Sequence, residues 1–136
     1  MLTEDALDRQ EACFARAFAA GDLALVRPLY DPAVVYVSPT VRLFGWPARI
    51  AGVEPTLDFI ARTIRNLRAI DYRAVEHAIV TGGQAAFVRV RFDFTRGGRR
   101  LRSEYVVVYR YRDGLIARQE LYYDPSGALE ELPPGV

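Results

Sequence analysis

Residues 71–123 read DYRAVEHAIVTGGQAAFVRVRFDFTRGGRRLRSEYVVVYRYRDGLIARQELYY. Apolar and polar side chains alternate through most of this segment, with the two-residue period that is typical of a β-strand. Three short turn signals interrupt the alternation: Gly82-Gly83, Gly97-Gly98 and Asp113-Gly114. Such dipeptides between alternating runs indicate β-hairpins. The segment therefore predicts four antiparallel strands near 71–80, 85–95, 101–112 and 115–123.

The residues before this segment follow a helical period instead. Thr3 can cap a first helix, and Gly21 ends it where a left-handed residue is needed. Its apolar stripe consists of Leu7, Phe14, Ala17 and Phe18. A short second helix is expected from Leu23 to Tyr30, although Pro28 strains it. A third is expected after Gly52, with Pro55 in its first turn. Its apolar residues at helical spacing are Leu57, Ile60, Ile64 and Leu67, with Phe59 beside them.

One further strand and two irregular segments complete the chain. Val34–Ser38 is β-branched and aromatic, which predicts a strand. The stretch from Thr40 to Ala51 is interrupted by glycine and proline and predicts an ordered loop that closes or covers a site. The tail from Pro125 to Val136 is expected to pack loosely. Helices first and an antiparallel meander afterwards predict one α+β domain over residues 1–136, in which a curved sheet wraps the helices.

Composition excludes several classes of function. All 18 basic side chains are arginine, so no lysine is present to form a Schiff base. The net charge of +1 gives no field to attract nucleic acid. The single cysteine cannot form an internal disulfide, which favours a cytoplasmic location. The amino terminus is acidic where a signal peptide is basic, and no apolar run approaches the roughly 20 residues that cross a membrane.

Several fragments carry a resemblance to a known family. They are Ala19-Ala20-Gly21-Asp22-Leu23, Leu29-Tyr30-Asp31-Pro32, Gly52 before the third helix, the run from Val107 to Ile116, and Tyr122-Tyr123-Asp124-Pro125. In this order and spacing the chain resembles the SnoaL-like polyketide cyclase and ketosteroid isomerase-like branch of the nuclear transport factor two-like superfamily. The resemblance implies a single SnoaL-like domain over 1–136, folded as a cone-shaped α+β roll (cystatin-like). It also implies a pocket for a small apolar or polycyclic ligand, no cofactor or metal, and pairing as a homodimer.

The catalytic residues of ketosteroid isomerases are absent at the matching positions. The base position falls on Ser38, the tyrosine donor on Phe14 and the second acid on Val107. Without a base or either donor, isomerisation by that route is excluded.

The limonene-epoxide hydrolase branch matches in part. Tyr36-x-Ser38 stands where that branch has a tyrosine-x-asparagine pair, and Arg91-x-Asp93 matches its arginine-x-aspartate pair. The second aspartate, which would deprotonate the attacking water, falls on Leu121, and this puts epoxide hydrolysis in doubt.

Arg91 and Asp93 allow two interpretations. Alternation places them with Arg89 on one face of a strand and the apolar residues on the other. That charged face is either exposed to solvent or, as the resemblance implies, turned into the pocket. In the second case Arg91 would stabilise developing negative charge and Asp93 would act as an orienter or weak base. Tyr36 would contact the ligand or donate a proton. These three are the predicted catalytic residues.

The predicted substrate-binding residues are those that the resemblance places around the pocket. They are Ser38, Phe14, Phe18, Trp46, Phe59, Arg89, Tyr105, Val107, Tyr109, Gln119, Leu121 and Tyr123. The leading hypothesis is a cofactor-independent enzyme for cyclisation, isomerisation or ring opening of an apolar, oxygenated, cyclic substrate. The alternatives are a non-catalytic ligand-binding or dimeric protein-interaction domain, and an epoxide hydrolase.

Overall fold

The computed structural model describes residues 1–39, 45–126 and 129–133. Over these ranges the chain forms two α-helices, two 3-10 turns and seven strands. In chain order they are α1 (Glu4–Ala20), η1 (Leu23–Leu25), η2 (Arg27–Leu29), β1 (Tyr30–Val37), β2 (Arg49–Ala51), α2 (Val53–Asn66), β3 (Arg68–Ile79), β4 (Ala85–Arg96), β5 (Arg99–Arg112), β6 (Leu115–Tyr123) and β7 (Glu130–Glu131).

The strands form one sheet in the order β2-β1-β6-β5-β4-β3, with β7 paired to β5. Strands β3 to β6 are antiparallel neighbours, which confirms the predicted meander. Gly97 and Gly98 both have positive φ, at 58° and 76°, and form the two-residue turn between β4 and β5. This backbone conformation suits glycine and matches the right-handed twist of the strands. The early strand β1 joins the sheet by running parallel to β6.

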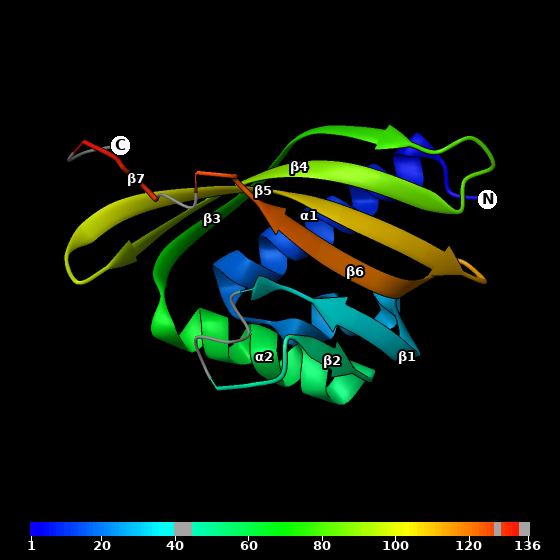
Figure 1. The fold of residues 1–136 in the computed structure, drawn as a ribbon, viewed down its shortest axis with the longest axis horizontal. Coiled ribbons are helices and arrows are strands. Elements are labelled where there is room, and N and C mark those ends of the chain that lie inside the picture. Colours follow the sequence, from blue (N-terminus) through cyan, green and yellow to red (C-terminus); the bar gives the residue numbers. More distant parts are fainter. Residues whose placement is uncertain (40–44, 127–128, 134–136) are drawn as a thin grey trace.

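The sheet curves around α1, and α2 lies along the side of β1 and β2 (Figure 1). The core fills the space between the helices and the concave face of the sheet. Leu7, Phe14 and Ala17 of α1 and Leu57, Phe59 and Ile60 of α2 are buried there. The expected α+β cone is therefore confirmed. Its helices pack inside the curve because each has one apolar face to bury.

The ends of α1 follow the predicted chemistry. The Thr3 side chain accepts a hydrogen bond from the Ala6 backbone N–H at 3.1 Å, and Gly21 closes the helix in the left-handed conformation. Helix α2 begins at Val53, directly after Gly52, and Pro55 lies in its first turn as expected, where no backbone donor is needed.

The predicted second helix was wrong. Residues 23–29 form the two short turns η1 and η2, and β1 begins at Tyr30. The backbone N–H groups of Val26 and Leu29 each donate to the carbonyl three residues earlier. Pro28 has no N–H to extend an α-helix, so the chain passes directly into the strand.

The predicted loop and tail also contain regular structure. Part of the loop forms β2, which pairs with β1, whereas residues 40–44 lie outside the described ranges. In the tail, β7 pairs with β5 and the Leu132 side chain is buried, so the expectation of loose packing was wrong for this part. No helix in the described ranges has the length and apolar composition needed to cross a membrane.

Candidate functional site

A cavity of about 420 Å³ lies between the concave face of the sheet, the end of α1 and helix α2. Its lining includes Asn66 and Leu67 at the end of α2 and Arg96 at the end of β4. These ends of α2 and β4 lie at the same end of the molecule (Figure 1). The lining residues are Phe18, Tyr36, Phe59, Ile60, Thr63, Asn66, Leu67, Phe92, Phe94, Arg96, Ser103, Tyr105, Leu121, Tyr123 and Leu129.

Aromatic rings form most of the floor of the cavity. The rings of Tyr105 and Tyr123 have centroids 5.1 Å apart, and Phe92 contacts Phe94 and Tyr105 at 5.9 and 6.2 Å. On the opposite side the ring of Tyr36 lies 5.5 Å from that of Phe59. Such tilted contacts are the favourable geometry for aromatic pairs and hold the rings in place. The floor therefore offers flat apolar surfaces to a ligand.

Three tyrosines, Tyr36, Tyr105 and Tyr123, provide polar groups within this apolar floor, and we refer to them as the tyrosine group. Tyr36 and Tyr105 are each no more than 7% exposed. Burial raises the pKa of both phenols well above the usual value of 10, and the neighbouring tyrosines raise the pKa further. Both hydroxyls therefore stay protonated at physiological pH, as hydrogen-bond donors and not as bases.

The hydroxyls of these two buried residues differ in their partners. A hydrogen bond with the Ser38 side chain opposes the rise in the pKa of Tyr36. The Tyr105 hydroxyl has no hydrogen bond to any residue of the described ranges. A buried tyrosine hydroxyl usually has a partner. Tyr105 is therefore the group best placed to donate to an oxygen atom of a ligand.

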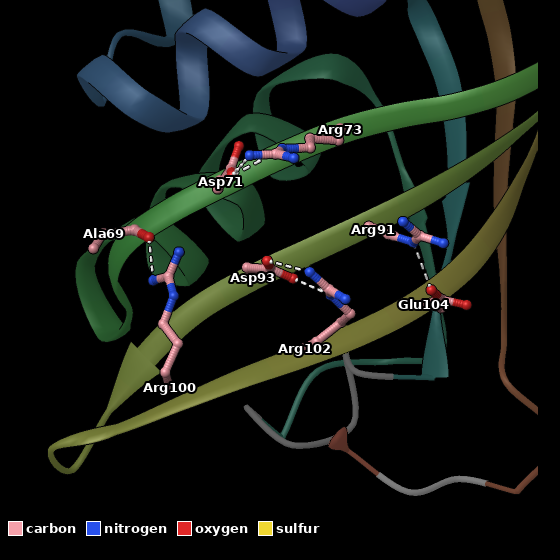
Figure 2. Close-up of polar contacts among 8 residues, drawn as sticks. All are labelled: Ala69, Asp71, Arg73, Arg91, Asp93, Arg100, Arg102 and Glu104. Atoms are coloured by element: carbon pink, nitrogen blue, oxygen red, sulfur yellow. Dashed lines mark hydrogen bonds and ion pairs between the residues drawn. The ribbon is translucent and has the colours of Figure 1, made fainter. Parts of the chain in front are cut away.

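Arg91 and Asp93 do not line the cavity, so the expectation that they face it was wrong. In β4 the inward positions are held by Val88, Val90, Phe92 and Phe94, which are buried. Arg91 and Asp93 lie on the opposite side, which we call the outer face, each directly across from its partner in β5. The Arg91 guanidinium donates to Glu104 at 2.9 Å, and Arg102 donates to Asp93 (Figure 2).

The charged side chains of the outer face form ion pairs with one another. The hydrogen bonds from Arg102 hold the pKa of the Asp93 carboxyl below its usual value. Arg89 on the same face pairs with Glu76. In β3, Asp71 pairs with Arg73 beside this group (Figure 2). Cross-strand pairing of opposite charges explains these residues without a ligand.

Six of the predicted site residues line the cavity: Tyr36, Phe18, Phe59, Tyr105, Leu121 and Tyr123. Four others, Phe14, Val107, Tyr109 and Gln119, are buried in the core away from its lining. Ser38 supports Tyr36, and Trp46 packs against Phe59 with its ring centroid 5.9 Å away. Ser38 and Trp46 therefore contact lining residues without lining the cavity themselves.

A buried carboxylate that sequence reasoning missed lies deeper in the cone. Glu11 of α1 accepts hydrogen bonds from the Tyr72 hydroxyl at 2.6 Å and from the Tyr109 hydroxyl at 3.0 Å. Burial raises the pKa of this carboxyl, and the hydrogen bonds only partly oppose that effect. Phe14 packs against the rings of both tyrosines, and none of these residues lines the cavity. Glu11 therefore belongs to the core and is not a base for a bound ligand.

The other residues that sequence reasoning missed are mostly those of the apolar face of β4 and the end of α2. Alternation assigned Phe92 and Phe94 to the core. They do face inward, but the cavity lies on that side of the sheet, so both residues line it. The helical spacing that identified Ile60 also places Thr63 and Leu67 on the same side of α2. That spacing is the signal that could have found them.

The described lining of the cavity offers no side chain that could act as a general base. Among the described lining residues there is no aspartate, glutamate or histidine. His77 pairs with Asp8 of α1, away from the cavity. Over the described part of the chain, no group of three histidine, cysteine, aspartate or glutamate side chains is placed to hold a metal ion. The site can donate hydrogen bonds and bury apolar surface.

Comparisons with known proteins agree with this fold. The family model for the SnoaL-like domain matches residues 11–119. A protein with a ketosteroid isomerase-like fold from Catenulispora acidiphila, solved in complex with trimethylamine, is 16% identical, with 85% of each chain covered and a TM-score of 0.69. An LEH-like epoxide hydrolase from M. tuberculosis is 20% identical, with 85% of this chain and 80% of that chain covered and a TM-score of 0.66. An NTF2-like protein of unknown function from Burkholderia pseudomallei is 19% identical, with 92% and 94% covered and a TM-score of 0.74. No curated protein matches the chain.

Proposed function

The chain belongs to the SnoaL-like domain family, and from that premise we propose that it binds an apolar, oxygen-bearing small molecule in the cavity. The ligand lies between the aromatic floor and α2, and one of its oxygen atoms accepts hydrogen bonds from the tyrosine group. The observation that carries the proposal is Tyr105, a buried residue that lines the cavity and whose hydroxyl has no hydrogen bond to a described residue.

The size and walls of the cavity support a small cyclic ligand. A volume of about 420 Å³ falls within the range of ordinary ligand pockets. Flat rings are favoured because Phe59, Phe92 and Tyr105 present faces or edges of aromatic side chains to the space. A carbonyl or ether oxygen on such a ring supplies the acceptor that the tyrosines require.

A second candidate function is catalysis of a reaction that needs only hydrogen-bond donors. Neutral tyrosine hydroxyls in an apolar pocket stabilise negative charge that develops on a carbonyl or epoxide oxygen. Without a base among the described lining residues, the nucleophile must belong to the substrate itself, as in an intramolecular cyclisation. Tyr36 remains a proposed proton donor, and the proton that the substrate's own nucleophile loses returns to the Tyr36 oxygen, so the tyrosine ends neutral. A route through Arg91 and Asp93 is not part of the proposal, since both lie on the outer face.

Ligand screening with matched variants tests both functions. The probes are ring compounds that carry a ketone and their analogues in which a methylene replaces the carbonyl. The ketones should raise the melting temperature of the protein more than the methylene analogues, and Tyr105→Phe should remove the difference. Tyr122→Phe is the control, because this tyrosine is 57% exposed and bonds Glu120. No binding by any probe contradicts the proposal, and mass analysis of bound material separates binding from turnover.

Pairing as a homodimer through the outer face is also proposed. Phe87 of β4 and Tyr122 of β6 are exposed on this side at 43% and 57%, on the two strands that flank β5. Exposed aromatic side chains among charges are typical of interfaces between subunits. Sedimentation at micromolar concentration should give a dimer, and a monomer would contradict this. The cytoplasmic location remains a prediction from the sequence.

A further inference from the structure

The cavity has a charged residue at its mouth. Arg96 is the last residue of β4, lies next to the turn at Gly97 and Gly98, and is exposed. It is the one charged side chain among the described lining residues. Over the residues that the structure describes, the mouth therefore carries a positive charge and the floor carries none.

Arg96 differs from its neighbours in having no partner. Arg99 donates to Glu131 at 2.7 Å, and Arg100 donates to the Ala69 carbonyl at 2.6 Å and to Thr95 at 3.2 Å. Arg96 forms no hydrogen bond or ion pair with any residue of the described ranges. Arg99 and Arg100 of the same hairpin are held by hydrogen bonds within the protein, whereas the Arg96 guanidinium at the mouth is available to a ligand.

No other described lining residue neutralises this charge. Those from the end of α2 and from the tail are Thr63, Asn66, Leu67 and Leu129, all uncharged. Thr63 and Asn66 donate to backbone carbonyls of their own helix, at 3.2 and 2.7 Å. A bound cation would meet repulsion from Arg96, whereas a bound anion would be attracted. The planar guanidinium matches a carboxylate through two parallel hydrogen bonds.

We propose that the ligand is an apolar organic acid whose carboxylate binds Arg96 at the mouth while its body fills the floor. This rests on the proposed function of the cavity and adds the charge and the orientation of the ligand. One guanidinium balances one negative charge, so a carboxylate is favoured over a phosphate monoester, which carries nearly two at neutral pH. The oxygen that meets the tyrosine group is then at the opposite end of the molecule from the carboxylate.

Matched acids and methyl esters test the inference. The panel contains linear medium-chain, monocyclic and naphthyl compounds, each as the free acid and as the neutral ester. In the unmodified protein, acids that fit should bind about tenfold more tightly than their esters. Arg96→Gln should remove that preference by weakening acid binding alone. Arg99→Gln is the control, because Arg99 lies on the same hairpin and does not line the cavity.

Charge reversal gives a second readout on a folded protein. Arg96→Glu should abolish acid binding and favour the primary amines with the same apolar bodies, while the esters bind as before. Since Arg96 is exposed, neither substitution is expected to affect folding, and circular dichroism checks this.

The outcomes separate the two proposals. If the esters bind but the acids show no advantage, or if Arg96→Gln leaves the advantage intact, the inference about the carboxylate is wrong and the cavity remains a binding site. If no acid or ester binds, the proposed function fails and the inference fails with it.

Discussion

The Asp93 carboxylate accepts two hydrogen bonds from the Arg102 guanidinium, at 2.7 and 2.9 Å, across neighbouring strands of the outer face. The two side chains are directly opposite in the ladder between β4 and β5. This geometry satisfies both oxygens of the carboxylate and both sides of the guanidinium fork. The pair therefore stabilises the strand register on the side of the sheet that faces away from the cavity.

The ion pair between Asp93 and Arg102 should make the free energy of unfolding depend on pH in the acidic range. Hydrogen bonding by Arg102 lowers the pKa of Asp93 from its usual 3.8. The folded protein thus releases this proton more readily than the unfolded chain does. The stabilisation is present above about pH 3.8 and is lost as the pH falls through the folded pKa. Asp93→Asn should reduce the free energy of unfolding by about 1–2 kcal/mol at neutral pH and weaken this acid dependence. Urea denaturation at several pH values measures both effects, and an unchanged acid dependence would contradict the assignment.

Arg91→Ala should leave ligand binding unchanged. Arg91 and Glu104 form an exposed pair on the outer face, with side chains 48% and 32% exposed. Exposed pairs contribute about 0–1 kcal/mol, so the change in stability should be small. Thermal shift with any ligand found for the cavity compares the variant with the parent protein. If Arg91→Ala lost ligand binding but kept its melting temperature, Arg91 would belong to the binding site and the placement on the outer face would be contradicted.

Glu11 should give the opposite dependence on pH. Burial raises the pKa of Glu11 from its usual 4.5, so the folded protein holds this proton more tightly than the unfolded chain does. The free energy of unfolding should therefore be largest at low pH and fall as the pH rises from about 4.5 through the folded pKa. Glu11→Gln should flatten this slope, because an amide does not titrate; its single oxygen can replace only one of the two carboxylate oxygens that accept from Tyr72 and Tyr109. Denaturation of both proteins between about pH 4 and pH 8 makes the comparison. Equal slopes would show that Glu11 titrates normally.

Tyr105→Phe should weaken binding of oxygen-bearing ligands by roughly three- to tenfold, which is the value of one neutral hydrogen bond. Its effect on stability should be small, since the hydroxyl has no hydrogen bond to a described residue. Calorimetric titration with a ketone and its methylene analogue isolates the contribution of the hydroxyl. The ketone alone should lose affinity, and an equal loss for both compounds would indicate a change in the shape of the cavity.

Leu132→Ala should destabilise the protein although it lies near the carboxyl end. The side chain is 8% exposed, next to β7, which pairs with β5. Removing a buried leucine side chain costs about 2 kcal/mol or more in the free energy of unfolding. Thermal and urea denaturation measure this cost. A variant as stable as the parent would restore the expectation of a loosely packed tail.

Local patterns predicted the fold well, because hairpin turns, helix caps and alternation act over a few residues. The two-residue turn at Gly97 and Gly98 and the caps at Thr3 and Gly21 formed where the sequence placed them. The helix expected at 23–30 failed because Pro28 shortened it into turns. The parallel pairing of β1 with β6 joins distant parts of the chain, and no local signal specifies it.

The site was predicted only in part for a related reason. The tyrosines Tyr36, Tyr105 and Tyr123 were found, since aromatic residues on inward positions are easily recognised. Arg91 and Asp93 were placed inside by matching a family motif. In a strand, a match displaced by one residue moves every side chain to the opposite face. Arg96 was missed because nothing in its local sequence distinguishes it from the other arginines of the hairpin.

The parallel contact between β1 and β6 has a consequence for synthesis on the ribosome. Tyr36 is made early and Leu121 late, yet their strands are neighbours and both residues line the cavity. Contacts between distant parts of a chain form late in folding. A nascent chain whose β6 residues are still inside the ribosome can form helix α1 but has no complete binding site. The capacity to retain a ligand thus arises only when translation of the sheet is nearly finished.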